Sequence, residues 1–235
     1  MIRAWAILTL LGLAFGNAPL VAGESRVVVE LFTSEGCSSC PPADALLAEL
    51  ASRPEVLALS FHVDYWDRFG WKDPFSSPEA TERQQRYASV LGPATVYTPQ
   101  IVIDGKSQAV GSDRAEVEHA LGSARREHTE VPVVLDLGRG VARIQLGPAQ
   151  GSISGAILLI GFDRRHASTV SRGENTGRNL VHTNVVRGIG EVGKFDGWGG
   201  AIEVPIAWQC DRVAVLVQAS DGSILGVAVG DSNSL

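Results

Sequence analysis

Two cysteines, Cys37 and Cys40, are separated by two serines in the segment FTSEGCSSCPPADALLAEL, residues 32–50. A Cys-x-x-Cys pair at a helix start can close a disulfide and perform redox chemistry. An apolar run precedes the pair and a helix-like run follows it, so the first sulfur is expected near open N–H groups of a helix N-terminus. That position stabilises a thiolate. Cys37 is therefore the candidate nucleophile, and Cys40 is the candidate thiol that resolves a mixed disulfide.

A metal site and a structural disulfide are the alternatives for this pair. Cys-x-x-Cys supplies only two ligands, and the sequence has no second such pair and no His-x3-His motif. We therefore expect no metal and no cofactor. A structural bond should bury the Cys37 sulfur and have a reduction potential below about −300 mV, whereas an active pair should lie well above that value.

Composition and charge favour a globular protein. The chain has 235 residues, of which 45% are hydrophobic, and its formal net charge is −6. Such a composition can form a real core. Because the charge is negative and no basic run is present, we expect no nucleic-acid partner.

The N-terminus has the pattern of an export signal. Arg3 precedes the apolar run at 4–15, which is too short to span a bilayer comfortably, and small residues follow at 21–23. We expect a signal peptide at residues 1–23 and an exported, periplasmic or secreted protein with no stable membrane insertion after cleavage. An uncleaved anchor is the alternative. Export permits disulfides, so Cys37 should pair with Cys40, leaving Cys210 free and buried.

The hydrophobic pattern divides the chain into two halves. The first half predicts strands and helices in the order βαβαββα, at 26–32, 41–52, 55–66, from Ser77–Pro78 to Leu91, on both sides of an Asp104–Gly105 turn, and at 112–127. The second half predicts only strands, at 131–147, 153–162, 201–208 and 210–230. The expected fold class is α/β, with a thioredoxin-like βαβαββα domain at 24–129 followed by a small all-β, sandwich-like domain at 130–235 packed on it.

A Thr-Pro pair strengthens the redox interpretation. Thr98–Pro99 precedes a strand and resembles the cis-proline loop of thioredoxins and glutaredoxins. The resemblance implies a cis bond at Pro99 and a backbone that pairs with a substrate strand. An ordinary trans proline is the alternative. Trp66, in the aromatic loop after the second strand, is a further candidate for substrate binding, or for packing alone.

Three segments resemble an uncharacterised family of exported bacterial proteins with a thioredoxin-like fold. They are VVELFTSEGCSSCPPAD, SFHVDYWDRFGWKDPFSSPEATERQQRYA and RGENTGRNLVHTNVVR, which begin at residues 28, 60 and 172. The resemblance covers nearly all of the mature chain. It implies fold and export, but supplies no established activity.

Proton transfer to the second thiol needs an acid or a base nearby. Thioredoxins carry a buried acid on the strand before their cysteines, and Glu30 is the nearest match, although its offset is one residue longer. One residue flips the face of a strand, so Glu30 lies either beneath the cysteines or away from them. Glu35 is the alternative and is expected to be solvated. His62 can transfer protons near neutral pH or can be a hydrogen-bonded core residue.

The second half contains one stretch that is dense in polar side chains, at 171–187. Its members are Arg172, Glu174, Asn175, Arg178, Asn179, His182, Asn184 and Arg187. A buried network that positions a hairpin against the first half would need this mixture. A binding site for a small anion or peptide, with arginines holding carboxylates, is the alternative.

The function that these patterns predict is an exported thiol–disulfide oxidoreductase acting on protein or small-molecule thiols and disulfides. The alternative is a non-enzymatic binding module, in which the disulfide is structural and the β domain carries a ligand or partner site.

Overall fold

The computed structural model describes residues 26–92, 95–125, 131–149 and 153–232. The predicted signal peptide at 1–23 lies outside the described residues. Along the chain the elements are β1 (Val27–Thr33), α1 (Pro41–Ala51), β2 (Val56–His62), a 3-10 helix (Asp64–Phe69), α2 (Pro78–Leu91), β3 (Gln100–Ile103), β4 (Ser107–Val110), α3 (Arg114–Ala124), β5 (Val133–Gly138), β6 (Val141–Leu146), β7 (Gly155–Thr169), β8 (Asn179–Phe195), β9 (Gly200–Pro205), β10 (Arg212–Gln218) and β11 (Ile224–Asp231).

Local signals set the bounds of the helices. Pro41 and Pro42 occupy the first turn of α1, where a missing N–H is tolerated. Ser77 caps α2 by accepting a hydrogen bond from the Ala80 amide, and Gly92 ends that helix with a φ of 89°. The cap of α3 is Asp113, whose side chain accepts from the Glu116 amide. The helices predicted from the sequence are therefore present close to their expected positions.

The predicted fold class, a thioredoxin-like βαβαββα domain followed by a small all-β domain, is wrong. A single mixed eight-stranded sheet runs through both halves in the order β11-β10-β7-β8-β2-β1-β3-β4. Strands β7, β8, β10 and β11 extend the sheet that β1–β4 begin, because β8 lies against the outer edge of β2 with Ser60 opposite Val185. An open edge at β2 would expose unpaired backbone groups, which β8 covers.

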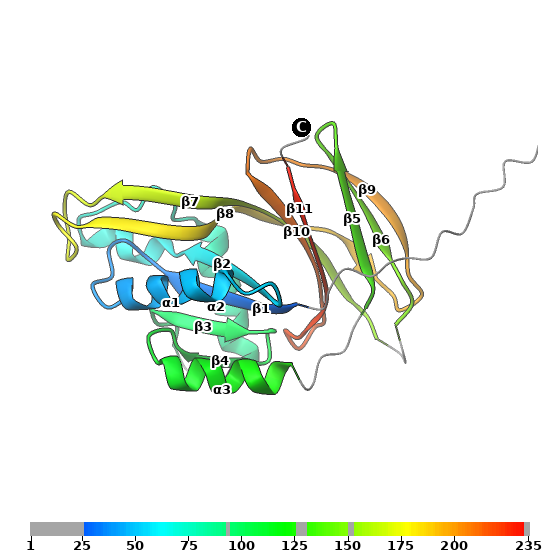
Figure 1. The fold of residues 1–235 in the computed structure, drawn as a ribbon, viewed down its shortest axis with the longest axis horizontal. Coiled ribbons are helices and arrows are strands. Elements are labelled where there is room, and N and C mark those ends of the chain that lie inside the picture. The colour runs from blue at the N-terminus through cyan, green and yellow to red at the C-terminus, as the bar shows by residue number, and fades with distance from the viewer. Residues whose placement is uncertain (1–25, 93–94, 126–130, 150–152, 233–235) are drawn as a thin grey trace, which may run out of the picture.

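The rest of the second half forms a second layer. Strands β5, β6 and β9 make a three-stranded antiparallel sheet. Its apolar side chains, such as Val133 and Ile144, pack with Ile157, Val213 and Val215 from the large sheet. The two sheets lie together at one end of the molecule in Figure 1.

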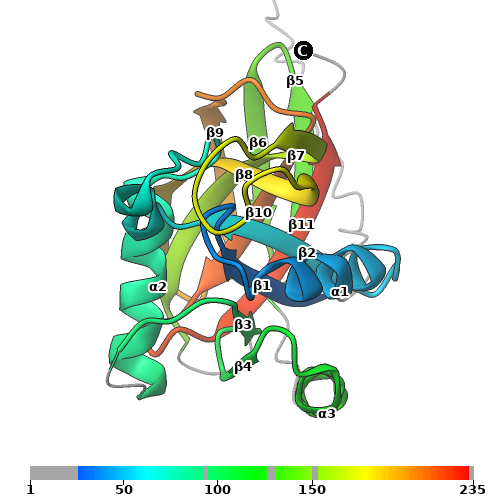
Figure 2. The same cartoon turned by 90° about the vertical axis from the view of Figure 1, so that its left-hand side faces the viewer.

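The helices cover both faces of the other end of the large sheet. Val29 and Leu31 of β1 face α1 and α3, where they pack with residues such as Leu47 and Leu121. Val28 and Phe32 face the opposite side and share a core with α2. Figure 2 shows α1 and α2 on opposite sides of β1 and β2. This alternation decides which side chains of β1 can approach the cysteines at the start of α1.

The longest hairpin carries the polar stretch to the site. Strands β7 and β8 pair from Gly155–Phe195 to Thr169–Asn179, and their connection extends past α1 and β2 (Figures 1 and 2). We call residues 170–178 the hairpin tip. The sequence predicted only the first part of β7 and did not predict β8 as a strand, because polar residues interrupt the apolar pattern there.

Within the described residues, every helix is too short or too polar to span a bilayer.

Candidate functional site

The two cysteines form a disulfide between the end of β1 and the start of α1. Cys37 and Cys40 are bonded, with their Cα atoms 5.4 Å apart. Cys40 is the N-terminal cap residue of α1, so the pair leads directly into the helix, as the sequence predicts. Ser39 Oγ lies 3.4 Å from Cys37 Sγ. Cys210 is free, as predicted, but it is only half-buried.

The open amides expected at the helix start are not available to the sulfur. Pro41 and Pro42 have no N–H, and the amides of Ala43 and Asp44 both donate to the Cys40 carbonyl. A thiolate at Cys37 would therefore be stabilised by the positive end of the helix dipole and by the Ser39 hydroxyl.

Both cysteines are fully buried, whereas the two serines between them are exposed. Burial of Cys37 is what a structural disulfide predicts, and the expected access of this sulfur to an incoming chain is wrong for this closed form. Two neighbours contact the disulfide loop. Trp66 lies against Gly36, where an added Cβ would come within 3.2 Å of the Trp66 Cβ, and the hairpin tip hydrogen-bonds to the loop backbone.

Asn175 and Glu174 attach the hairpin tip to the disulfide loop. Asn175 is fully buried, and its Nδ2 donates to the carbonyls of Glu35 and Cys37 at 2.8 and 2.9 Å. Glu174 accepts from the Ser38 amide at 3.1 Å. These contacts hold the backbone on both sides of Cys37, so the hairpin tip covers the pair through three side-chain hydrogen bonds.

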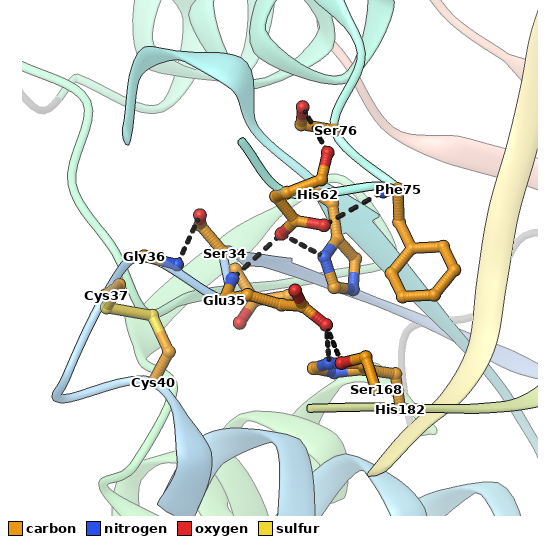
Figure 3. Close-up of polar contacts among 12 residues, drawn as sticks. Ser34, Glu35, Gly36, Cys37, Cys40, His62, Phe75, Ser76, Ser168 and His182 are labelled. Carbon is orange, nitrogen blue, oxygen red and sulfur yellow. Dashed lines mark hydrogen bonds and ion pairs between the residues drawn. A yellow bond between two sulfur atoms is a disulfide. The ribbon is translucent and has the colours of Figure 1, made fainter. Parts of the chain in front are cut away.

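A cluster of buried ionisable side chains lies beside the disulfide. Its members, which we call the acid–imidazole cluster, are Glu35, Asp44, His62, Asp73 and His182. They come from the disulfide loop, α1, β2, the segment after the 3-10 helix, and β8. Figure 3 shows Glu35 extending from the disulfide loop toward His182 and Ser168.

Glu35 was expected to be solvated, but its carboxylate is fully buried. Trp71 Nε1 donates to it at 2.7 Å, Ser168 donates through its hydroxyl, and His182 Nε2 lies 3.2 Å from Oε1. Burial opposes ionisation, but the contacts with His182, Ser168 and Trp71 outweigh it and lower the pKa of Glu35. Glu35 is therefore an ionised carboxylate held between the disulfide loop and the β7–β8 hairpin.

His62 and Asp73 form a second buried pair. His62 Nδ1 lies 2.7 Å from Asp73 Oδ2, and Asp73 also accepts from the Glu35 and Phe75 amides at 2.8 and 2.9 Å. Burial disfavours the imidazolium, but Asp73 outweighs it and raises the pKa of His62. Burial likewise disfavours the Asp73 carboxylate, but His62 outweighs it and lowers the pKa of Asp73. Both shifts favour the ion pair.

Asp44 has a different environment from the other two acids. Thr33 Oγ1 donates to Asp44 Oδ1 at 3.0 Å, and His182 Nδ1 lies 3.9 Å from Asp44 Oδ2. Burial raises the pKa of Asp44, which His182 and His62 only partly offset. The rings of His62 and His182 are 4.6 Å apart, and one nitrogen of each has no hydrogen-bond partner among the described residues. No three or more His, Cys, Asp and Glu side chains in the described segments are arranged to hold a metal ion.

The structure does not bring Glu30 to the cysteines. Its carboxylate accepts hydrogen bonds from Arg83 and from Tyr87, both on α2, so it lies on the sheet face opposite α1. Glu30 is one residue further from Cys37 than the buried acid of thioredoxins is from its cysteine, and this places its side chain on the other face of the strand. A proton-transfer role for Glu30 at the disulfide is therefore wrong, and its role in this structure is to pair a buried guanidinium.

The predicted substrate-binding residues lie together beside the disulfide loop. The Thr98–Pro99 bond is cis, as expected, and Pro99 is buried. Trp66 Nε1 donates to Thr98 Oγ1 at 2.8 Å. This contact joins the Thr-Pro loop to the side chain that packs on Gly36. Their binding of a substrate strand stays a prediction.

The polar stretch divides between the site and its surroundings. Asn175, Glu174 and His182 contact the disulfide loop and the acid–imidazole cluster, and Arg178 donates to Asn175 Oδ1 at 2.9 Å. Asn184 donates to the Ala58 carbonyl of β2 at 2.8 Å. Arg187 lies instead beside Asp163 and the Phe75 ring, and Arg172 is exposed.

Comparison with known proteins places the chain in a family. The model for "Protein of unknown function (DUF1223)" matches residues 28–219. The chain belongs to this family. The X-ray crystal structure of protein AGR_C_4864 from Agrobacterium tumefaciens is 32% identical, with a TM-score of 0.79 over 91% of this chain and 98% of that one. No curated protein matches the chain.

HBP35 of Porphyromonas gingivalis is a more distant structural relative. It is 15% identical, with a TM-score of 0.60 over 88% of this chain and 75% of that one. At this identity the likeness concerns the fold alone.

Sequence reasoning missed several site residues. Asp44, Asp73 and Ser168 were not singled out. Asp44 had a usable signal, because it follows Cys40 by one helical turn and is an acid among the apolar residues of α1. Asp73 and Ser168 had none, because only the tertiary fold brings them to Glu35 and His62.

The His62–Asp73 pair predicts a pH-dependent contribution to stability. The pKa of His62 is raised above 6.5, so its contribution is full below pH 6.5 and is lost as the pH rises through the folded-state pKa. The pKa of Asp73 is lowered below 3.8, so its contribution is present above pH 3.8 and is lost in stronger acid. Between these values, the His62→Gln variant should be less stable by about 3 kcal/mol, because one partner of a buried ion pair is removed.

Urea unfolding of the oxidised wild type and of His62→Gln at a series of pH values measures this difference. It should be largest near pH 5 and should shrink above neutrality. A difference that stays constant from pH 5 to pH 9 would contradict an ion pair at His62.

Proposed function

We propose that the protein is a thiol–disulfide oxidoreductase whose redox centre is the Cys37–Cys40 pair, acting on protein or small-molecule thiols and disulfides. The observation that carries this proposal is the acid–imidazole cluster directly beside the disulfide. A disulfide that only staples a loop gains nothing from such a cluster. Burying five ionisable side chains, with two imidazole nitrogens that have no partner among the described residues, costs free energy. Shifted pKa values gather at sites that move protons.

The chemistry follows from the order of the two sulfurs. In the reduced protein the Cys37 thiolate attacks one sulfur of a substrate disulfide, whose S–S bond breaks as the other sulfur leaves with the electron pair. The Cys40 thiolate then attacks Cys37 in the mixed disulfide and releases the second substrate sulfur as a thiolate. The substrate gains two electrons, and the pair returns to the disulfide that the structure holds.

Access to Cys37 requires movement of the hairpin tip. The closed form buries both sulfurs, and three hydrogen bonds from Asn175 and Glu174 attach the hairpin tip to the loop. Each such bond contributes about 1 kcal/mol, so the closed form is separated from an open one by a few kcal/mol. We propose that exchange takes place from this open form.

Export is part of the same proposal. The apolar run at 4–15 and the small residues at 21–23 support a signal peptide, and an exported compartment permits the disulfide.

The first prediction concerns turnover. Wild-type protein should catalyse the reduction of insulin by dithiothreitol or the oxidation of a dithiol peptide, and Cys37→Ser should lose this activity completely. Cys210→Ser is the matched control and should keep it, because Cys210 is unpaired. Wild-type protein that exchanges with no dithiol or disulfide between pH 6 and pH 9 would end the proposal.

The second prediction concerns the hairpin tip. Asn175→Ala removes two of the three hydrogen bonds that attach the hairpin tip to the disulfide loop. The free energy of separating the tip from the loop should therefore fall by about 2 kcal/mol, and reduction of the disulfide by dithiothreitol should become about 30-fold faster. Asn179→Ala is the control. It changes an exposed amide of the same hairpin that accepts a hydrogen bond from Thr169, and this variant should react at the wild-type rate. The rate is followed by trapping thiols with a chromogenic reagent. Equal rates in all three proteins would mean that the hairpin tip does not control access.

A specific observation favours the alternative function, a binding module with a structural disulfide. A cavity of about 810 Å³ lies between α2 and strands β7 and β8, with Tyr87 and Gln218 beside apolar side chains such as Leu158 and Ile189. Its size suits a small organic ligand. Burial of both cysteines also favours this function. It predicts an inert disulfide, so the insulin assay separates the two.

A further inference from the structure

We propose that Asp44 is the proton donor to Cys40 when the disulfide is reduced. This inference rests on the proposed redox role of the pair. It names one carboxyl group of the acid–imidazole cluster as the source of the proton that Cys40 takes up on reduction.

Helix geometry places Asp44 beside Cys40. Cys40 is the N-terminal cap of α1 with helical φ and ψ of −78° and −35°, and the Asp44 amide donates to its carbonyl at 3.1 Å. Residues four apart lie on the same face of a helix, with their Cβ atoms roughly 5–6 Å apart. Asp44 and Cys40 are 7% and 0% exposed. The two side chains therefore occupy one buried face at the start of α1.

The other two acids of the cluster cannot serve as the donor because hydrogen bonds and ion pairs stabilise their carboxylate forms. Glu35 is stabilised by Trp71, Ser168 and His182. Asp73 accepts from two backbone amides and pairs with His62. Both pKa values are lowered. A carboxylate that is held ionised in this way has no proton to give near neutral pH.

Asp44 differs because it receives a single hydrogen bond among the described residues, from Thr33 Oγ1 at 3.0 Å. Burial raises its pKa. The charged or titratable groups that act on it are His182 on β8, His62 on β2 and Asp73 in the segment before α2. Of the three buried acids, Asp44 is therefore the one whose surroundings favour the protonated form, and in our proposal it holds the proton in the oxidised protein.

The proton balances the reduction. A reductant thiolate attacks Cys37 Sγ, the Cys37–Cys40 bond breaks, and its electron pair goes to Cys40 Sγ. The Asp44 proton then moves to that sulfur, giving a Cys40 thiol and an Asp44 carboxylate. A second reductant thiolate attacks the reductant sulfur of the mixed disulfide and releases Cys37 as a thiolate. The protein thus gains two negative charges, on Cys37 and on Asp44, while the Cys40 sulfur beside Asp44 stays neutral.

The new carboxylate lies near one imidazole ring. His182 Nδ1 lies 3.9 Å from Asp44 Oδ2 and has no hydrogen-bond partner among the described residues. Because His182 also contacts Glu35, the same ring links the redox state of the pair to the β7–β8 hairpin.

Infrared difference spectroscopy tests the proton transfer directly. The protein is reduced chemically with an excess of a phosphine, and the reduced-minus-oxidised spectrum is recorded. We expect the loss of one protonated carboxyl C=O band and the gain of one S–H band. The carboxyl band should shift in protein labelled with ¹³C-aspartate, which assigns it to an aspartate and excludes Glu35. It should be absent from Asp44→Asn and unchanged in Glu49→Gln, an exposed acid on the same helix that pairs with Arg114.

A spectrum with no carboxyl loss, or with a band that persists in Asp44→Asn, overturns the assignment. Because the phosphine reduces the protein without a substrate, the result does not depend on turnover. Insulin reductase activity without the carboxyl band would contradict the role of Asp44 and leave the proposed function standing. The carboxyl band in a protein that does not reduce insulin would support the role of Asp44 and contradict the proposed function.

Discussion

The site depends on one buried carboxylate. Glu35 leaves the disulfide loop and accepts hydrogen bonds from β7 and from the segment after the 3-10 helix, with His182 of β8 beside it. A carboxylate without access to water is costly unless donors surround it, so these segments must stay in place while Glu35 stays ionised. The Glu35 backbone also ties the loop to Asp73 and Asn175. The position of the disulfide is therefore set by residues far away in the sequence.

The pairing of the large sheet bears on how firmly the β7–β8 hairpin is held to the disulfide loop. Strand β8 meets β2 at a single register pair, Ser60 with Val185, whereas β7 and β8 pair along their whole length. The outer part of the hairpin is therefore held to the disulfide loop mainly by side chains. Side-chain hydrogen bonds contribute about 1 kcal/mol each, which is why we propose that the hairpin tip separates without unfolding the sheet. In the proposed function, a covered disulfide and a reactive one are two states of the same structure.

The sequence predicted the elements better than their assembly. The helices α1 and α2 and the turn at Asp104–Gly105 follow from caps, prolines and glycine, which act locally. The pairing of β8 with β2 joins distant residues, and no local pattern specifies it. The pairing of Cys37 with Cys40 was predicted from neighbouring residues, and the cis Thr98–Pro99 bond from the resemblance to thioredoxins and glutaredoxins. The partners of Glu35 were not predicted, because they are distant in the sequence. The proton-transfer role predicted for Glu30 was wrong because one residue more or less between Glu30 and Cys37 decides which face of β1 the side chain occupies.

The cluster also separates two kinds of buried acid. The pKa values of Glu35 and Asp73 are lowered by their donors and partners, whereas burial raises the pKa of Asp44. Groups with similar chemistry are thus shifted in opposite directions by their surroundings, a pattern typical of sites that move protons. A structural disulfide would need no such difference.

The reduction potential of the Cys37–Cys40 pair tests the central claim most directly. It is measured by equilibrating the protein with glutathione or dithiothreitol buffers and trapping the thiols with acid and an alkylating agent. A redox centre predicts a potential well above about −300 mV, within reach of cellular thiols. A potential below that value would show that the disulfide is structural, and the cluster would then need another explanation.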